Sequence, residues 1–277
     1  MEPYKIIASG RTAELLEYGE GTVLKLLRDG FPPHEADDEF ALSKLIYEAG
    51  VPCPKPYEVV DLHNRRGIVY ERVIGDTMLR TIAKQPWRTR NEAKRMAHAH
   101  AETHKRSVDG LPSQKKMLEW RIRAAPYLAD GEKDRIVKYL HALPDGSQLC
   151  HGDYHPDNVM CGDRFFVIDW MNAVSGNAAG DVARSVLLLR FGTLPDDMPA
   201  LLRSFFSFAR SRMLSRYEAA YRKETGMLRE EIEAWMLPYA AARLVEGVPE
   251  AEKIRIVSYI KNRLDQLDDK GASNTHE

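Results

Sequence analysis

The sequence predicts an α+β fold in which a small antiparallel β-sheet precedes a larger, mainly helical part. Two observations predict it. Short apolar or β-branched runs bounded by glycines fill roughly the first seventy residues, whereas helical patterns dominate after Gly75. We therefore expect a sheet lobe over residues 1–73 and a helical lobe over residues 74–277, and a chain of 277 residues is long enough for both.

The sheet lobe is expected to contain five strands, with one helix inserted after the third. Glycines 19 and 21 between the second and third strands indicate a tight hairpin turn. The helix should run from about Ala36 to Ala49, with its apolar stripe on Leu42, Leu45, Ile46 and Ala49, and Gly50 should end it. The predicted strands are residues 4–8, 13–18, 22–27, 57–61 and 66–71.

The helical lobe begins with a helix over residues 89–106, for which Thr89 and Glu92 have the spacing of a capping box. Further helices are expected near residues 113–128, 131–142, 181–191, 197–224, 228–245 and 250–267. Three short strand-like segments interrupt this pattern, at residues 148–150, 158–161 and 165–169. The residues best suited to chemistry cluster around them.

Composition excludes several function classes. Forty basic residues against forty-one acidic ones give a net charge of −1, which does not favour nucleic-acid or anionic-membrane binding. No apolar run approaches the roughly 18 residues needed to cross a bilayer. The three cysteines form no C-x-x-C pair, so a reducing, cytoplasmic setting is the simpler interpretation. No obligate protein partner is indicated.

The most informative segment is H-G-D-Y-H-P-D-N over residues 151–158, followed by V-I-D-W over residues 167–170. Asn158 and Asp169 stand at the two ends of a predicted hairpin, which brings them together. A carboxylate and an amide oxygen suit Mg²⁺, a hard ion that proteins hold with few ligands. Asp153 is then available to accept a proton from an attacking hydroxyl, which is the layout for phosphoryl transfer. The alternative is that these residues only form turns.

Lys25 is the expected partner of this segment in the sheet lobe. Strand alternation places it on the same face as Val23 and Leu27, where an ammonium needs a nearby anion. Glu39 can supply that anion from the helix, and the pair would direct the ammonium at nucleotide phosphates. A lysine on an edge strand that reaches solvent is an equally good interpretation of this residue alone.

With V-I-D-W-M-N-A and G-D-V-A-R, the H-G-D-Y-H-P-D-N motif resembles the aminoglycoside phosphotransferase and choline-kinase-like family, whose fold resembles the protein kinases. Further resemblances extend over about residues 5–190. S-G-R-T-A-E over residues 9–14 is similar to the family's nucleotide-covering loop, and T-V-L-K-L to its lysine strand. E-F-A-L to A-G-V-P over residues 39–52 looks like its first helix, and V-Y-E-R-V over residues 69–73 like its hinge strand.

The resemblance implies a role for each matching residue. Asp153 would be the catalytic aspartate, and Asn158 and Asp169 would hold Mg²⁺. Lys25 would contact the nucleotide phosphates with Glu39 as its ion-pair partner. The remaining implied roles are nucleotide contacts at Ser9 and Gly10, adenine contacts of the backbone near Glu71 and Val73, and bracing of the catalytic loop by His151 and Asp181.

The sequence departs from the family pattern at two places. The residue before the metal-binding Asn, often Gly in this family, is Asp157, which tolerates unusual backbone angles better than most residues. The nucleotide loop has Gly10 but no G-x-G-x-x-G, so its phosphate contacts are open.

One further pattern is rejected as a zinc motif. His100 and His104 share a helix face, as in the zinc-protease helix. In that motif the glutamate follows the first histidine directly, whereas Glu102 sits one place later and points elsewhere.

The predicted function is transfer of the γ-phosphoryl group of ATP or GTP to a small-molecule hydroxyl. Only eleven residues separate Asp169 from Asp181, too few for the activation segment of a protein kinase. Residues 196–267 hold twelve Lys and Arg against eleven Asp and Glu, which gives no sign of a wall selective for cations. Aminoglycosides, choline-like amines, sugars and amino alcohols all remain open as acceptors. The alternative is a catalytically inactive nucleotide-binding protein that acts as a sensor or partner.

Overall fold

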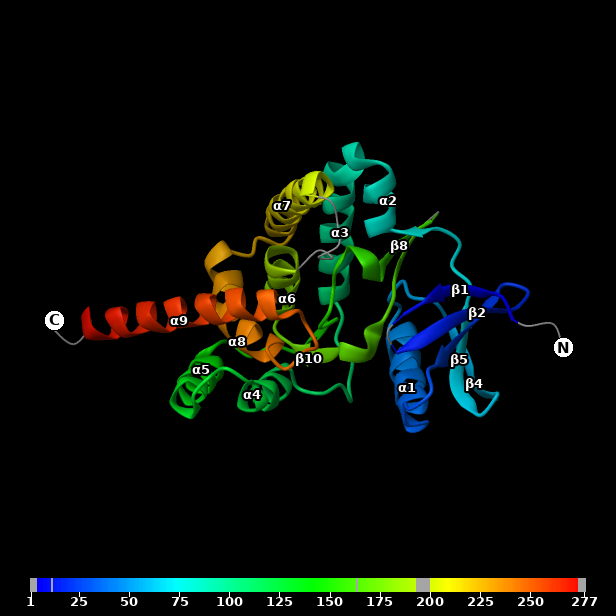
Figure 1. The fold of residues 1–277 in the computed structure, drawn as a ribbon, viewed down its shortest axis with the longest axis horizontal. Helices are drawn as coiled ribbons and strands as arrows, with labels where there is room; N and C mark the ends of the chain where they lie inside the picture. Colours follow the sequence, from blue (N-terminus) through cyan, green and yellow to red (C-terminus); the bar gives the residue numbers. More distant parts are fainter. Residues whose placement is uncertain (1–3, 11, 163, 193–199, 274–277) are drawn as a thin grey trace. The chain divides into compact units, whose positions relative to one another are not determined.

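A computed structural model describes residues 4–10, 12–162, 164–192 and 200–273. The chain folds as two compact units (Figure 1). The first comprises residues 1–84 and 156–172, and the second residues 85–155 and 173–277. The hairpin that carries Asn158 and Asp169 therefore belongs to the first unit, whereas Asp153 belongs to the second.

The first unit is built on a five-stranded antiparallel sheet with the strand order β1-β2-β3-β5-β4 (Figure 1). This confirms the predicted sheet, and helix α1 follows the third strand as expected. The bounds are β1 (Ile6–Ser9), β2 (Ala13–Gly19), β3 (Thr22–Leu27), α1 (His34–Glu48), β4 (Pro56–Leu62) and β5 (Arg65–Glu71).

Both faces of the sheet are covered by apolar side chains, because alternate residues of β3 enter different clusters. Leu27 packs with Ala36 of α1 and Ile68 of β5, whereas Leu24 packs with Leu16 and other residues on the opposite face. Lys25 alternates with Leu24 and Leu26, so it shares the face of Leu27, toward α1. Gly50, with φ +74°, directly follows the α1 C-cap, as predicted.

The predicted apolar stripe of α1 is wrong in part. Leu45 is 40% exposed, and the positions that α1 buries are Ala36, Glu39, Ser43 and Ile46. Two of these four, Glu39 and Ser43, are polar. They can be buried because side chains of the neighbouring strands form hydrogen bonds with them. Of the four buried positions, the predicted apolar stripe therefore contained only Ile46.

The rest of the first unit is a small three-stranded sheet with the order β6-β8-β9, together with helix α2 and two single-turn helices. Helix α2 and strand β6 were not predicted. The bounds are β6 (Asp76–Thr77), α2 (Met78–Lys84), η2 (Pro156–Asn158), β8 (Val159–Cys161), β9 (Phe165–Val167) and η3 (Trp170–Asn172). Trp170–Asn172 packs against α1.

The second unit is mainly helical, as predicted (Figure 1). Helix α3 packs against α7, α6 against α7 and α8, and α4, α5 and α9 each against α8. The bounds are η1 (Pro86–Arg88), α3 (Thr89–His104), α4 (Gln114–Ala124), α5 (Asp130–Ala142), α6 (Ala178–Phe191), α7 (Ala200–Thr225), α8 (Arg229–Arg243) and α9 (Glu250–Ser273). The predicted start of α7 at residue 197 lies outside the described residues.

Two short strands, β7 (Gln148–Cys150) and β10 (Val174–Gly176), pair antiparallel in this unit and lead into and out of the segment of interest. No described helix combines the length and the apolar character that a membrane span requires.

The capping box predicted at Thr89 is wrong. Arg88 is the N-cap of α3, and the Thr89 hydroxyl donates to the carbonyl of Pro86 at 2.6 Å. Glu92 is fully buried and forms ion pairs with Arg88 at 2.7 Å and Arg95 at 3.2 Å. The preceding single-turn helix continues almost directly into α3, so Thr89 already has helical geometry and cannot cap.

Candidate active site

Lys25 lies in the interior of the five-stranded sheet. Its strand, β3, is flanked by β2 and β5, where Lys25 pairs with Leu15 and Ile68. The interpretation as an edge-strand lysine is therefore wrong. Its Nζ donates to Glu39 Oε1 at 2.7 Å, which is the ion pair expected from the sequence.

The Glu39 carboxylate is buried, with 5% of its surface exposed, and sequence reasoning missed its other partners. The Tyr70 hydroxyl donates to Glu39 Oε1 at 3.1 Å and lies 2.9 Å from the Ser43 hydroxyl. Glu39 Oε2 is buried and has no hydrogen-bond partner among the described residues. Burial of Tyr70 and the nearby Glu39 charge raise the pKa of that phenol well above its usual value, so it stays a donor.

Asp169 is the second anion near Lys25. Its Oδ1 lies 3.6 Å from Lys25 Nζ, and 46% of its side chain is exposed. Burial alone would lower the pKa of the Lys25 ammonium, but the charges of Glu39 and Asp169 outweigh this effect and raise it. The ammonium is therefore fully charged and held between a buried carboxylate and an exposed one.

The backbone at Asp169 has a left-handed conformation, with φ 64°. Only a small fraction of non-glycine residues adopt it, and Asp is among those that tolerate it best. Such strain persists where the surroundings fix it and is often found at functional sites. This conformation turns the chain at Asp169, two residues after the end of strand β9.

Asn158 is the last residue of the single turn η2 and directly precedes strand β8 of the same hairpin. Val159 pairs with Val167, and the next backbone amide, that of Ile168, donates to the Asn158 carbonyl at 3.0 Å. Asn158 therefore lies just before strand β8 and Asp169 just after strand β9, both at the same end of the hairpin. Asn158 is mostly buried. An amide oxygen beside an exposed carboxylate is a donor set that fits Mg²⁺, which prefers oxygen ligands and keeps several waters.

Asp157 does not need the backbone freedom of the glycine that it replaces. It lies in the single turn Pro156–Asn158 and is not among the described residues with positive φ. Its Oδ1 accepts a hydrogen bond from the Thr77 hydroxyl at 2.7 Å. The departure from the family pattern is therefore compatible with the turn.

The predicted nucleotide loop is held by a residue that sequence reasoning missed. Arg28 donates from Nη2 to the Ser9 hydroxyl at 2.5 Å and from Nε to the Gly10 carbonyl at 3.0 Å. Arg11, in the same loop, lies outside the described residues. The Arg28 side chain is 40% exposed. Its guanidinium therefore adds a positive charge beside this loop, apart from that of Lys25.

The predicted adenine-contacting segment leaves strand β5 at Glu71 and continues through Val73. The Glu71 amide donates to the Lys55 carbonyl at 2.8 Å, and the Lys55 amide donates to Glu71 Oε2 at 3.2 Å. The segment is thus anchored to the residue before β4. The adenine contacts themselves stay a prediction.

In the second unit, Asp153 lies against a buried arginine. Asp153 Oδ1 accepts from Arg184 Nη2 at 2.9 Å, and its Oδ2 lies 3.6 Å from His155 Nε2. Burial would raise the pKa of the Asp153 carboxyl, but the hydrogen bond with His155 and the charge of Arg184 outweigh it and lower that pKa. Asp153 is therefore a carboxylate at neutral pH.

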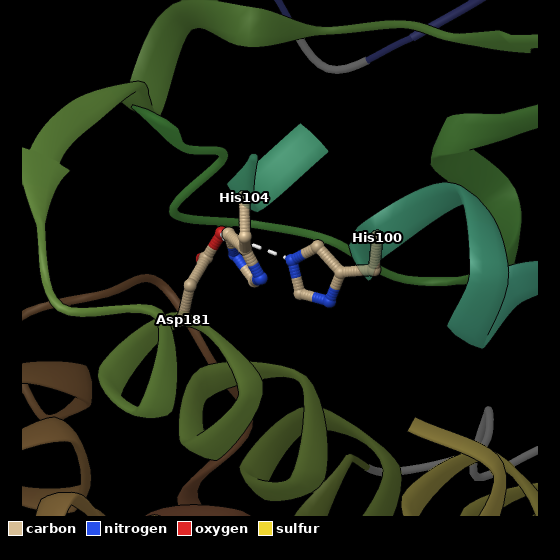
Figure 2. Close-up of side chains that lie close together, drawn as sticks. All are labelled: His100, His104 and Asp181. Carbon is tan, nitrogen blue, oxygen red and sulfur yellow. Dashed lines mark hydrogen bonds and ion pairs between the residues drawn. The ribbon is translucent and has the colours of Figure 1, made fainter. Parts of the chain in front are cut away.

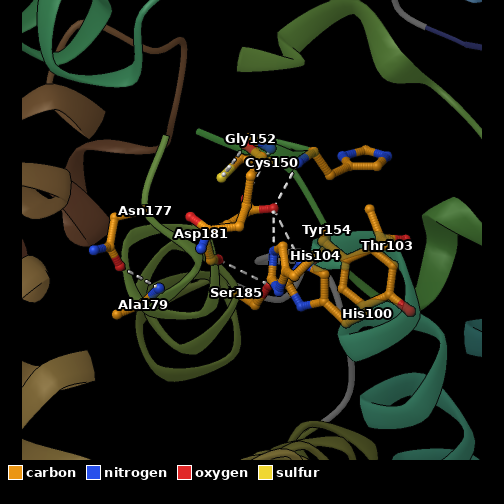
Figure 3. A network of polar contacts seen from close by, with 12 residues as sticks. His100, Thr103, His104, Cys150, Gly152, Tyr154, Asn177, Ala179, Asp181 and Ser185 are labelled. Atoms are coloured by element: carbon orange, nitrogen blue, oxygen red, sulfur yellow. Dashed lines mark hydrogen bonds and ion pairs between the residues drawn. The ribbon is translucent and has the colours of Figure 1, made fainter. Parts of the chain in front are cut away.

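Asp181 holds the backbone of the H-G-D segment. Its Oδ2 accepts from the His151 amide at 2.5 Å. Its Oδ1 accepts from the Gly152 amide at 2.8 Å, and Figure 3 shows Gly152 beside Asp181. Gly152 has φ +77°, a conformation that favours glycine. His151 is fully buried, and its Nδ1 accepts from the Asp153 amide at 3.2 Å. These contacts fit the bracing roles expected of His151 and Asp181.

His100 and His104 complete this cluster, a role that sequence reasoning missed. Both Nε2 atoms face Asp181 Oδ2, at 3.0 and 3.2 Å (Figure 2). Their Nδ1 atoms lie 2.7 Å from the hydroxyls of Tyr217 and Tyr221 on α7. Burial is the main cause that lowers the pKa of His100 to about 3, so its imidazole is neutral. The Tyr217 hydroxyl then donates to Nδ1, and Nε2 donates to Asp181.

The two histidines and Asp181 offer three ligand atoms within 4.8 Å of one another. The hydrogen bonds just described already use every one of those atoms, and Asp181 also holds the loop amides. The cluster is thus complete as a hydrogen-bond network. Glu102 is directed elsewhere, to Lys105, as the sequence predicted.

Taken separately, the two units supply different chemistry. The first holds a lysine between two carboxylates, with an amide beside them, which suits polyphosphate and a divalent cation. The second holds a carboxylate on a braced loop, which suits a hydroxyl. One signal in the sequence pointed to both: the D-x-x-x-x-N segment, residues 153–158, followed by Asp169.

Comparison with known proteins agrees with this geometry. Residues 4–227 match the sequence profile described as the phosphotransferase enzyme family. No curated protein matches the chain in sequence. Among solved structures, an aminoglycoside-3'-phosphotransferase of type VIII is 18% identical, with a TM-score of 0.55 over 87% of this chain and 93% of its own.

Two further solved structures have the same fold. A thermostable mutant of the aminoglycoside phosphotransferase APH(4)-Ia, in complex with AMP-PNP and hygromycin B, is 15% identical, with a TM-score of 0.60 over 98% of this chain and 94% of its own. Aminoglycoside phosphotransferase APH(3'')-Id from Streptomyces rimosus is 14% identical, with a TM-score of 0.54 over 86% of this chain and 92% of its own. These similarities confirm the predicted fold, a sheet lobe with a helical lobe.

Proposed function

We propose a specific reaction for this chain from the premise that it belongs to the phosphotransferase enzyme family. The reaction is transfer of the γ-phosphoryl group of ATP or GTP to a hydroxyl of a small molecule. The acceptor oxygen forms a bond to the γ-phosphorus, the bond from that phosphorus to the β–γ bridging oxygen breaks, and the nucleoside diphosphate leaves. The hydroxyl proton leaves by way of Asp153.

The observation that carries the proposal is the position of Lys25 between Glu39 and Asp169. The buried Glu39 carboxylate fixes the ammonium in place, so the lysine can bind nucleotide phosphates without first being ordered. Asn158 and Asp169 would hold Mg²⁺. The ion would neutralise phosphate charge and polarise the phosphorus–oxygen bond.

The remaining assignments give nucleotide contacts to the first unit and the acceptor contact to the second. Ser9, Gly10 and the cation of Arg28 would cover the phosphates, and the backbone near Glu71 and Val73 would meet the base. Asp153 would accept a hydrogen bond from the acceptor hydroxyl, with its loop braced by His151 and Asp181. The solved relative with AMP-PNP and hygromycin B motivates the choice of nucleotide and hydroxyl substrates to test.

We place the reaction in the cytoplasm, because no disulfide joins Cys53, Cys150 and Cys161. The acceptor class is not fixed by the charges of the second unit, so the test uses four classes. They are aminoglycosides, choline-like amines, sugars and amino alcohols.

The test is a phosphoryl-transfer screen over that panel, with γ-labelled ATP and GTP each supplied with Mg²⁺ or with chelator. We expect label on at least one acceptor, only with Mg²⁺, and transfer that is slower by roughly 10²–10⁴-fold with Asp153→Asn. Nucleotide binding without transfer to any acceptor would instead support an inactive nucleotide-binding protein. Transfer at a near-normal rate in Asp153→Asn would contradict the assignment of that residue.

A further inference from the structure

Arg184 of helix α6 is a buried cation shared by two carboxylates. Only 6% of its side chain is exposed. Its Nη2 donates to Asp153 Oδ1 at 2.9 Å and to Glu246 Oε2 at 3.1 Å, and its Nη1 lies 2.8 Å from Glu246 Oε1. A planar guanidinium presents its donors in a fixed fork, so two carboxylates fix both its position and its orientation.

Glu246, which follows helix α8, is itself held by further arginines. Arg243 Nη1 donates to Glu246 Oε2 at 2.7 Å, and Arg121 Nη1 of helix α4 lies 3.8 Å from Glu246 Oε1. Arg243 Nε also donates to the buried Glu252 of helix α9 at 2.6 Å. The contacts form one chain of ion pairs that runs from Asp153 to α9.

The charges of this chain balance. Arg121, Arg184 and Arg243 stand against Asp153, Glu246 and Glu252. Buried charges are tolerated when they are paired and hydrogen-bonded, and removing one partner leaves another uncompensated. Arg184 is therefore anchored from behind by Glu246 and is not free to turn away from Asp153.

We propose that Arg184 is the positioning residue of Asp153: it fixes the carboxylate through Oδ1 and keeps it ionised, so that Asp153 orients the acceptor hydroxyl as a hydrogen-bond acceptor. This inference rests on the proposed function, because it names how the assigned residue works. It also assigns a role to the last residue of the G-D-V-A-R segment.

Each charged or titratable neighbour of Asp153 acts in a known direction. Arg184 on α6 favours the ionised carboxylate, and so does His155 on the same loop whenever it donates a hydrogen bond. The negative charge of Glu246, on the far side of Arg184, disfavours the ionised form of Asp153. The positive charges of Arg121 and Arg243 partly offset this effect of Glu246. His151 receives the Asp153 amide, so it fixes the backbone. The hydrogen bond with His155 and the charge of Arg184 therefore both favour the ionised form, and of these two residues Arg184 is the buried one, held on its far side by Glu246.

An ionised carboxylate of low proton affinity is a weak base. Phosphoryl transfer has a loose transition state in most analyses, in which positioning and electrostatics supply most of the catalysis. A carboxylate that accepts the hydroxyl hydrogen bond and orients the oxygen is then sufficient, and the proton can leave late. Displacing such a group by about 1 Å can cost about 10²-fold in rate.

The test measures the Asp153 carboxyl directly in the full chain, by carbon-13 NMR titration of aspartate-labelled protein, with Asp153→Asn to assign the signal. In Arg184→Gln we expect the Asp153 pKa to rise by about 1–3 pH units, the usual effect of a neighbouring opposite charge. Turnover should fall about 10²-fold. Arg184→Lys keeps the charge but loses the fork, so its Asp153 pKa should stay low while turnover falls.

Arg243→Gln is the matched control. It also removes a buried arginine from the chain of ion pairs, but one that does not touch Asp153, so the Asp153 pKa should stay near that of the wild type. If Arg184→Gln does not fold, Arg184→Gln with Glu246→Gln removes a cation and an anion together and keeps the charge balance. The Asp153 pKa should rise in that double variant as well.

An Asp153 pKa that does not change on removal of Arg184, or that rises equally in Arg243→Gln, overturns the inference. The titration needs no substrate. A protein that transfers no phosphoryl group but shows the expected shift therefore contradicts the proposed function and leaves the Arg184–Asp153 relationship standing.

Discussion

The Lys25 ammonium and the Glu39 carboxylate form a 2.7 Å ion pair between strand β3 and helix α1. Glu39 also accepts a hydrogen bond from Tyr70, and its other oxygen is buried without a partner among the described residues. A buried carboxylate of this kind is stabilised mainly by the one cation beside it. The pair therefore links the packing of α1 to the position of the ammonium.

The pair predicts non-additive effects on turnover. Lys25→Met keeps a side chain of similar length but loses the phosphate contact, so it should lose most activity. Glu39→Gln should have a milder effect of the same kind, because the lysine remains but is less well fixed. The coupling in transition-state free energy, measured from kcat/KM of both single variants and the double, should be about 0.5–3 kcal/mol.

The exposed pair of Lys44 and Glu48 on the same helix, 3.9 Å apart, is the matched control. The same cycle with Lys44→Met and Glu48→Gln should show a coupling near zero, because exposed ion pairs contribute little. Strict additivity at Lys25 and Glu39, or full activity in Lys25→Met, would show that the first unit does not bind nucleotide as proposed.

Asp169 is expected to couple nucleotide binding to Mg²⁺. Asp169→Ala should abolish the Mg²⁺-dependent part of ATP binding and leave the fold intact, because 46% of the side chain is exposed and it fills no core. Calorimetry with Mg²⁺ and with chelator measures this directly. Asp61→Ala, which removes a more exposed carboxylate from the same unit, is the control.

Wild-type protein that binds ATP equally well with chelator present would exclude Asn158 and Asp169 as the metal site. Circular dichroism of Asp169→Ala separates this outcome from loss of structure.

Asp153→Asn is expected to reduce turnover by roughly 10²–10⁴-fold, the usual range for a group that assists proton transfer. The amide keeps the size of the side chain and one acceptor oxygen but loses the charge and the second acceptor. Nucleotide affinity should stay near the wild-type value, since the assigned role concerns the acceptor. Steady-state kinetics and nucleotide calorimetry together measure both, and the exposed Asp134→Asn is the control. Near-normal turnover would contradict the assignment.

The sequence was a good guide where local pattern decides the structure. Strand β3 has the bounds predicted for it, and Lys25 and Glu39 meet as expected, because strand alternation and helix periodicity fix their faces. The hairpin of Asn158 and Asp169 was likewise predicted from two short apolar runs.

Contacts between distant segments were beyond local pattern. The Tyr70 hydroxyl bonds to both Glu39 and Ser43, from 31 and 27 residues away in the sequence. The local pattern of α1 does not show this partner, so its buried face was misjudged at Leu45. Arg184 meets Asp153 across 31 residues. In the sequence, His100 belonged only to a pattern that was rejected as a zinc motif. Nothing in the sequence around it indicates that its Nε2 forms a hydrogen bond with Asp181, 81 residues away.

The buried His100 gives a stability prediction with a definite sign. Its pKa is lowered to about 3 in the folded state, mainly by burial, against about 6.5 when the chain is unfolded. Between these values the unfolded chain binds a proton that the folded chain does not, so the free energy of unfolding falls as pH falls. The Asp181 pKa is also lowered, but that contribution is lost only below about pH 4, where an unfolded aspartate takes up its proton.

His100→Gln should therefore flatten the pH dependence of stability between about pH 6.5 and 4.5. Over this interval the histidine accounts for up to about 2–3 kcal/mol of the unfolding free energy of the wild type, at about 1.4 kcal/mol per pH unit. The His100→Gln variant is less stable than the wild type at pH 7 if the glutamine fits the site poorly. The quantity compared is therefore the change of the unfolding free energy with pH, measured by urea unfolding, and not the unfolding free energy at one pH. His141→Gln, which replaces an exposed imidazole of the same unit, should keep the wild-type slope. An unchanged slope in His100→Gln would mean that the imidazole takes up a proton inside the folded protein, and the donation from its Nε2 to Asp181 could no longer be assigned to the neutral ring.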